Sequence, residues 1–134
     1  MFTKKKRSQI MAKVKGKNTR PEKIVRSLLH AMGFRFRLHV TALPGKPDIV
    51  LPRYKKIIFV HGCFWHGHRG CKRSARPKTK KRFWNAKLDA NIRRDKEHVK
   101  RLRNRGWKVR TIWECQTRNI KKLYHTLESF MYRN

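Results

Sequence analysis

The sequence predicts a single α/β domain in which a mixed β-sheet is flanked by helices. The length of 134 residues suits one domain. Along the chain, the spacing of apolar residues indicates the order helix, three strands, helix, strand, helix. Helices that alternate with strands in this way favour a sheet with helices packed against it.

The first helix is predicted to begin next to Thr19. Thr19 can cap the helix, Pro21 suits its first turn, and Glu22 follows three residues after the cap, as in a capping box. Gly33 is expected to end the helix. In between, apolar residues recur at helical spacing at Ile24, Val25, Leu28, Leu29 and Met32.

Four segments are predicted to form strands. Residues 34–40 alternate strictly between apolar and polar types, which is typical of a half-buried strand. A turn at residues 43–47 leads to a short strand at residues 48–51. Residues 56–60 are apolar enough to lie in the centre of the sheet, and residues 107–114 form the last strand.

Two further helices are predicted from apolar stripes. A long helix is expected over residues 84–104 and ends before Gly106; its apolar side is formed by Leu88, Ile92, Val99 and Leu102. A final helix over residues 119–131 is expected to bury Ile120, Leu123, Leu127 and Phe130.

The charge of the chain limits its function more than any other bulk property. There are 38 Lys and Arg residues against 7 Asp and Glu, which gives a formal net charge of +31. Self-repulsion on this scale opposes a compact fold unless a polyanion relieves it, and nucleic acid is the polyanion that we expect. A ribosome-like structural protein and a binder of anionic membranes are the alternatives.

The start of the chain is expected to act as an arm. Residues 1–18 are basic with little apolar pattern, so we expect them to lie on phosphates and leave residues 19–134 as the domain. The basic start MFTKKKR lacks the apolar stretch of a signal peptide. No window of about 18 apolar residues predicts a transmembrane helix.

Residues 61–71, HGCFWHGHRGC, concentrate the unusual chemistry of the chain. The chain has three cysteines, an odd number that argues against a closed set of disulfides. Cys63 and Cys71 follow the third strand and Cys115 follows the fourth, so neighbouring strands would bring the sulfurs together. With His68 they would form a Cys3His zinc site, whereas the alternative is three ordinary buried thiols.

Few acids stand in so basic a chain, and Asp48 differs from the rest. It opens a strand although Asp is a poor strand former, so it is a candidate Mg²⁺ ligand, with His61 and His66 as candidate acid–base groups. Glu114 directly precedes Cys115 and is expected to support the metal site. The other acids on predicted helices are expected to form surface ion pairs: Asp89, Asp95, Glu97 and Glu128. On these grounds a nuclease and a binding module are equally open.

Several short strings nevertheless occur together in one known family. They are GKNTRPE at 16–22, FRFR at 34–37, LPGKPDIV at 43–50, FVHGCFWH at 59–66, FW at 83–84, GW at 106–107 and WEC at 113–115. With these strings the chain resembles the very short patch repair (Vsr) endonucleases, nearly end to end.

The resemblance implies both an activity and a fold. Such enzymes nick one DNA strand on the 5′ side of the thymine in a T:G mismatch, which arises when 5-methylcytosine deaminates. It therefore implies a Mg²⁺-dependent DNA mismatch endonuclease that initiates very short patch repair, with a restriction-endonuclease-like core. It further implies a monomeric bacterial protein of the cytoplasm, associated with the nucleoid and not with a membrane, with mismatch-repair proteins as candidate partners.

Site residues are implied by the same resemblance. The Mg²⁺ ligands fall on Asp48 and the backbone carbonyl of Val60, and catalysis falls on Asp48, His61, His66 and Glu22. One histidine would activate the attacking water, and Glu22 would orient His66 or a water on the metal. The structural Zn²⁺ would be held by Cys63, His68, Cys71 and Cys115.

Aromatic residues of the family wedge into the base stack beside the mismatch. Here those positions are Phe64 and Trp65, with Trp84 on the same platform. The apolar residues of the arm would insert from the opposite groove: Ile10, Met11 and Val14. Because a mismatched step is the least costly to unstack, wedging itself favours damaged DNA.

Two other functions stay open beside this one. A zinc-stabilised DNA-binding protein without catalysis would bind irrespective of mismatch and of Mg²⁺. A nuclease of this family with relaxed specificity would also cleave matched DNA, and the net charge of +31 favours the tight non-specific binding that this needs.

Overall fold

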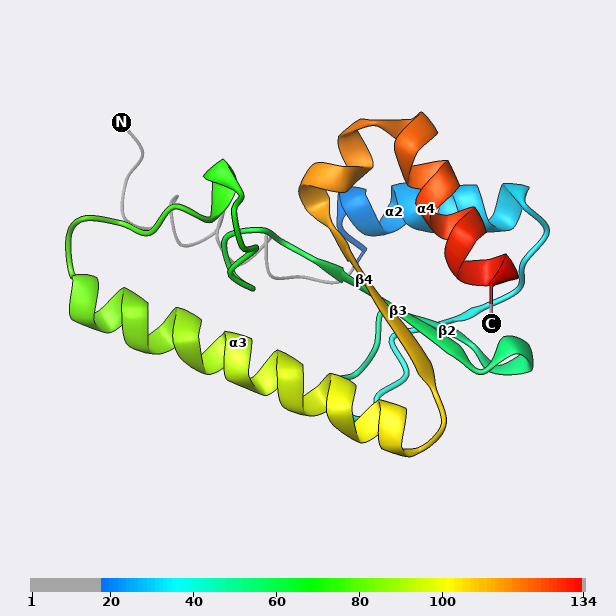
Figure 1. The fold of residues 1–134 in the computed structure, drawn as a ribbon, viewed down its shortest axis with the longest axis horizontal. Helices are drawn as coiled ribbons and strands as arrows, with labels where there is room; N and C mark the ends of the chain where they lie inside the picture. The colour runs from blue at the N-terminus through cyan, green and yellow to red at the C-terminus, as the bar shows by residue number, and fades with distance from the viewer. Residues whose placement is uncertain (1–17, 134) are drawn as a thin grey trace.

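The computed structural model describes residues 18–133 and contains a four-stranded mixed sheet with helices on both faces (Figure 1). The strands, in sheet order, are β1 (Arg37–Leu38), β2 (Ile49–Leu51), β3 (Lys56–His61) and β4 (Lys108–Trp113). The first three are antiparallel neighbours, and β3 pairs with β4 in parallel. The predicted α/β class is confirmed. The arm residues Ile10, Met11 and Val14 lie outside the described residues.

Within the described residues, three helices cover the sheet. Helices α2 (Arg20–Ala31) and α4 (Ile120–Tyr132) lie on one face, and the long helix α3 (Lys81–Asn104) crosses the other (Figure 1). Short 3₁₀ turns complete the fold: η1 (Pro52–Tyr54), η2 (Lys72–Ser74) and η3 (Glu114–Arg118). Within residues 18–133, no helix has the length and apolar character needed to cross a bilayer.

The pleat of the central strands divides the core in two. On one face Ile49, Leu51 and Ile58 pack with apolar residues of α2 and α4. On the other, Val50, Ile57 and Phe59 pack with Leu102 of α3. Successive side chains of a strand point to opposite faces, so β2 and β3 can be apolar throughout only because both faces are covered. The central position predicted for residues 56–60 is confirmed.

The strand predicted over residues 34–40 is wrong in length. Only Arg37 and Leu38 pair with β2, and both are exposed. Phe34 is buried and Phe36 packs against the core, so these apolar residues reach the interior without strand pairing. The strand ends where His39 turns into the left-handed region at φ +47°.

The predicted helices differ from the observed ones at one boundary and in the burial of one residue. Helix α3 begins at Lys81, before the predicted residue 84. In α4 the buried face is Leu123, Leu127 and Met131, and Ile120 is 48% exposed, so its predicted burial is wrong. The three buried residues are spaced by four, so they form one stripe that leaves Ile120 at the open first turn.

Lys56, on β3, holds the C-terminal end of α4 against the sheet through hydrogen bonds. Its ammonium group is buried and donates to the carbonyl oxygens of Phe130 and Met131, both at 2.7 Å, and of Arg133 at 3.2 Å. Burial lowers the pKa of Lys56 from its ordinary value. The last carbonyls of a helix lack partners within it, and a cation there also complements the helix dipole.

Candidate functional site

One cavity of about 920 Å³ collects the predicted catalytic residues and Mg²⁺ ligands. Its wall is formed by the start of α2, the segment between β1 and β2, the end of β3, the following loop and one face of α3. Glu22, Asp48, Val60, His61 and His66 all line it, with other residues. These five residues, up to 44 positions apart in the sequence, therefore share one space.

Asp48 sits at the entry to β2 and faces the neighbouring strand. Its Oδ2 accepts a hydrogen bond of 2.8 Å from the backbone N–H of Val60. This contact reaches another strand, so Asp48 is not acting as a turn aspartate that bonds its own local backbone. Burial raises the pKa of Asp48 to about 6, although the Val60 hydrogen bond opposes the shift. The carboxylate is thus poorly compensated by protein groups, as expected for a ligand that needs a cation.

Glu22 is 4% exposed and lies at the centre of a polar cluster. Its Oε2 accepts from Arg26 Nη2 at 2.8 Å and from the backbone N–H of Asn18 at 3.2 Å, and it lies 3.0 Å from His39 Nε2. Thr19 caps the helix by accepting from Glu22 N–H, as predicted. The carboxylate, however, takes the N–H of Asn18 instead of that of Thr19, so the capping box is only half formed.

His61 and His66 stack on each other at the end of β3. Their ring centroids are 3.8 Å apart and the rings are nearly parallel, at 9°. Burial, with a smaller contribution from the neighbouring His66, lowers the pKa of His61 to about 3. His61 is therefore a neutral imidazole at physiological pH.

His66 has a carboxylate partner that the sequence analysis did not assign to it. Its Nδ1 lies 2.7 Å from Asp95 Oδ2, and Asp95 comes from the middle of α3. Glu22, which was expected to orient His66 or a water on the metal, contacts Asn18, Arg26 and His39. A carboxylate on one ring nitrogen fixes the tautomer of the imidazole and leaves the other nitrogen to accept a proton.

The loop after β3 is held against α3 by a close approach. Gly67 has φ +62°, and a Cβ there would lie 2.5 Å from Ile92 Cδ1, so only glycine fits without displacement. Asn91 Nδ2 donates to the carbonyl oxygen of Trp65 at 3.0 Å. Asn91 and Asp95 are one turn apart on α3. The contacts of Gly67 with Ile92 and of Trp65 with Asn91 therefore place His66 next to Asp95.

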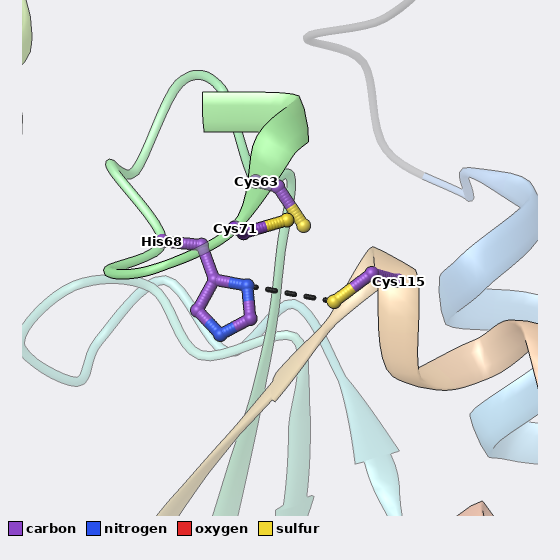
Figure 2. A group of neighbouring side chains, drawn as sticks. All are labelled: Cys63, His68, Cys71 and Cys115. Atoms are coloured by element: carbon purple, nitrogen blue, oxygen red, sulfur yellow. Dashed lines mark hydrogen bonds between the residues drawn. The ribbon is translucent and has the colours of Figure 1, made fainter. Parts of the chain in front are cut away.

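Four side chains meet at a second site (Figure 2). One ligand atom each of Cys63, His68, Cys71 and Cys115 lies within 4.8 Å of the others. The side chains come from the loop and from η3, and Figure 2 shows the sulfurs and the imidazole turned toward a common centre. Among the described residues no cysteine is in a disulfide.

The donor set at this second site fits a structural zinc ion. Three sulfurs and one imidazole are a known Zn²⁺ ligand set. The three cysteines, as thiolates, would repel each other unless a dication is bound between them. Burial raises the pKa of the Cys63 thiol to about 12 without metal. Glu114 supports the site as expected, because its Oε1 accepts from the Cys63 backbone N–H at 3.0 Å.

Aromatic side chains form a cluster beside the cavity, which Phe64 and Trp65 line. Phe64, Trp65 and Trp84 contact each other with ring centroids 5.1 to 5.9 Å apart. All three are half-buried, and Phe83, which is 57% exposed, extends the cluster through Trp84. The predicted aromatic platform is thus assembled from the loop and the first turn of α3.

Asp95 and His39 are the functional candidates that the sequence analysis missed. Asp95 was expected to form a surface ion pair, yet it interrupts the apolar stripe of α3 at a position of inward spacing; the stripe runs Leu88, Ile92, Asp95, Val99, Leu102. That spacing was a signal. His39 alternates with Arg35 and Arg37 on the expected polar face of a strand, so no local pattern indicated its inward turn.

Sequence comparison with known proteins assigns the chain to a family. The sequence model of the family described as "DNA mismatch endonuclease Vsr" matches residues 1–73. The chain is 46% identical to "Type II nicking enzyme V.XorIIP" of Xanthomonas oryzae pv. oryzae, covering 94% of this chain and 92% of that protein. It is 41% identical to "DNA mismatch endonuclease Vsr" of Escherichia coli, covering 87% of this chain and 74% of that one.

A solved structure agrees with the fold. The chain is similar to "Homing Endonuclease I-Bth0305I Catalytic Domain", with a TM-score of 0.57 and 22% identity, over 84% of this chain and 94% of that one. At this identity the similarity concerns the fold alone, and it confirms the restriction-endonuclease-like core that the family resemblance implied.

Proposed function

This chain belongs to the DNA mismatch endonuclease Vsr family, and from that premise we propose that it nicks one strand of duplex DNA 5′ to the thymine of a T:G mismatch. As a DNA endonuclease of mismatch repair it would initiate very short patch repair where 5-methylcytosine has deaminated. The observation that carries the proposal is the His66–Asp95 pair, which shares one cavity with Asp48.

Asp48 and the backbone carbonyl of Val60 would hold the Mg²⁺ ion. The fit rests on the raised pKa of Asp48, because a buried carboxylate that lacks a protein cation is stabilised by a metal cation. When bound, Mg²⁺ supplies positive charge that polarises the scissile phosphate. Glu22 lines the same cavity and adds a second carboxylate to the site.

His66 is the group best arranged to activate the attacking water. With Nδ1–H donated to Asp95, its Nε2 can accept the proton of that water, and the Asp95 carboxylate stabilises the imidazolium that forms. His61 stacks against the face of the His66 ring. Because burial keeps His61 neutral, it can donate or accept a hydrogen bond without carrying charge.

Recognition of the mismatch is assigned to the aromatic cluster. Phe64 and Trp65 lie in the same loop as His66, so a wedge inserted beside the mismatch would set the distance to the scissile phosphate. The Trp84 ring contacts the rings of Phe64 and Trp65. Zn²⁺ on Cys63, His68, Cys71 and Cys115 would stiffen this loop, and the arm at residues 1–18, with Ile10, Met11 and Val14, would contact DNA from the other groove.

The remaining proposals concern organisation. Residues 19–134 form one endonuclease domain that acts as a monomer on DNA. The protein works in the bacterial cytoplasm at the nucleoid, where its substrate lies, and mismatch-repair proteins are candidate partners.

One nicking assay tests the proposal. A duplex with a single T:G pair, labelled on the thymine strand, is incubated with protein and Mg²⁺ beside the matched T:A duplex. The expected result is one labelled product that ends 5′ to the thymine, formed only from the mismatch and abolished in Asp48→Ala. Equal cleavage of both duplexes, or full activity of Asp48→Ala, would contradict it.

A family nuclease with relaxed specificity is the second candidate. The net charge of +31 favours strong binding to any phosphate backbone. It predicts nicks in matched DNA at many sequences in the same assay at low salt. The other alternative, a DNA-binding protein without catalysis, does not agree with membership of an endonuclease family.

A further inference from the structure

His39, Glu22 and Asp48 form a group with the spacing of metal ligands. Glu22 lies on α2, His39 follows β1 and Asp48 precedes β2, and one ligand atom of each lies within 4.8 Å of the other two. His39 Nε2 lies 3.0 Å from Glu22 Oε2. Two adjacent ligands of an octahedral ion, each about 2.1 Å from the metal, lie about 3.0 Å apart. The pair thus has the spacing of one edge of such an octahedron.

The backbone presents His39 to this group in an uncommon conformation. Its φ of +47° is left-handed, which non-glycine residues rarely adopt. The conformation is fixed by a hydrogen bond of 3.1 Å from the N–H of His39 to the carbonyl oxygen of Asp48. A regular strand would have carried the imidazole outward beside Arg37, so the turn serves to bring it to the two carboxylates.

The negative charge of Glu22 and Asp48 is only partly balanced by cationic side chains. Glu22 is 4% exposed, and Asp48, close to it, is held by a backbone N–H. Among the described side chains, Arg26 is the permanently charged partner of Glu22, at 2.8 Å. Among the described residues Asp48 forms no ion pair, so a bound divalent ion would balance its charge.

We propose that His39 is a nitrogen ligand of the divalent ion held with Glu22 and Asp48, and that it tilts the site from Mg²⁺ toward transition ions such as Mn²⁺. The inference rests on the proposed function, since the ion is the one that Asp48 is proposed to hold there. Mg²⁺ takes oxygen ligands almost exclusively, whereas an imidazole adds affinity for first-row transition ions.

Mn²⁺ titration of the zinc-loaded protein, followed by electron paramagnetic resonance, tests the proposal without DNA or turnover. In the wild type, the spin echo of bound Mn²⁺ is expected to carry the modulation of a directly coordinated ¹⁴N. In His39→Gln, whose amide oxygen replaces the ring nitrogen, the modulation should vanish. The Kd for Mn²⁺ should rise about tenfold, and the Kd for Mg²⁺, from competition, should change less than about threefold.

Two further variants control for folding and for other histidines. His39→Asn tolerates the left-handed backbone but is too short to reach the ion, so it should lose the nitrogen signal while melting near the wild-type temperature. His98→Gln changes another histidine that lines the same cavity and packs on Gly45, and it should leave Mn²⁺ binding unchanged.

The outcomes separate this inference from the proposed function. If His39→Gln keeps the nitrogen modulation and the Mn²⁺ affinity while Asp48→Asn abolishes binding, His39 is not a ligand, and the cation site at Asp48 stands. If Mn²⁺ binding does not depend on Asp48, both proposals fail. Modulation that is lost in His61→Gln or His66→Gln instead of His39→Gln also overturns the assignment.

Discussion

His66 Nδ1 lies 2.7 Å from Asp95 Oδ2, and this contact joins the loop after β3 to the middle of α3. The two residues are 29 positions apart, and the approach of Gly67 to Ile92 brings them together. The pair gives His66 the orientation and electrostatic support of a general base.

Replacing Asp95 with Asn should lower the rate of nicking about 10²- to 10⁴-fold, because the amide cannot stabilise the imidazolium of His66. Single-turnover kinetics at saturating protein would measure the rate, and the pH profile should change shape because the partner of His66 is altered. DNA affinity should stay near that of the wild type. Asp89→Asn, which removes an exposed acid on the same helix, is the control and should nick normally; equal losses in both variants would refute the role of Asp95.

Asp48→Asn should stabilise the Mg²⁺-free protein at pH 8. Burial raises the pKa of Asp48 from 3.8 to about 6, so the fold favours the protonated acid. That stabilisation is complete below pH 3.8 and is lost as pH rises through about 6, a loss of about 3 kcal/mol for this shift. Asn keeps a neutral acceptor for the Val60 N–H.

Thermal unfolding checks the sign of this effect. Asp48→Asn should be about 1–3 kcal/mol more stable than the wild type at pH 8, and the two should converge near pH 4. A variant that is less stable at pH 8, or a difference that grows toward acid, would contradict the assigned cause.

Zinc should be released by His68→Gln. Metal analysis should find about one Zn²⁺ per wild-type chain and far less in the variant, and unfolding should become easier by about 3 kcal/mol or more, because binding energy at such sites is folding energy. His125→Gln, an exposed histidine on α4, should retain the metal and the stability. Full zinc content in His68→Gln would remove His68 from the ligand set.

Trp65→Ala should weaken the discrimination between T:G and matched DNA. Loss of one aromatic stack costs about 1–3 kcal/mol, which corresponds to roughly 5- to 150-fold in affinity for the mismatch. Binding isotherms on mismatched and matched duplexes, at one salt concentration, give the ratio directly. Tyr124→Ala, an exposed aromatic on α4, should leave the ratio unchanged. A wedge role is refuted if Trp65→Ala weakens both duplexes equally.

Lys56→Met should destabilise the fold by about 1–3 kcal/mol. It removes the charged donor that satisfies three carbonyl oxygens at the end of α4, and the buried length of the side chain is kept. Denaturant unfolding measures the change, and Lys121→Met, exposed on α4, is the control. Unchanged stability in Lys56→Met would show that water replaces the ammonium group at no cost.

Local patterns in the sequence were enough to place most elements. The cap at Thr19, the glycines at 33 and 106, and the apolar runs of β2 and β3 are each read within a few neighbouring residues, so periodicity finds them. The segment at residues 34–40 was overestimated for the same reason. Alternation reports which side chains are apolar, but pairing depends on whether a partner strand continues, and β2 is only three residues long.

By itself, the sequence determined the α/β order, the need for an anionic partner and, through strings such as HGCFWH and PGKPD, the family. Those properties depend on residue types and short spacings. Only the tertiary structure decided which side chains meet: Asp95 with His66, and His39 with Glu22 and Asp48. The physical reason is that hydrogen bonds and metal coordination act over about 3 Å in space, whatever the separation along the chain. The packing of α3 and the left-handed turn at His39 create that proximity, and no local pattern encodes either.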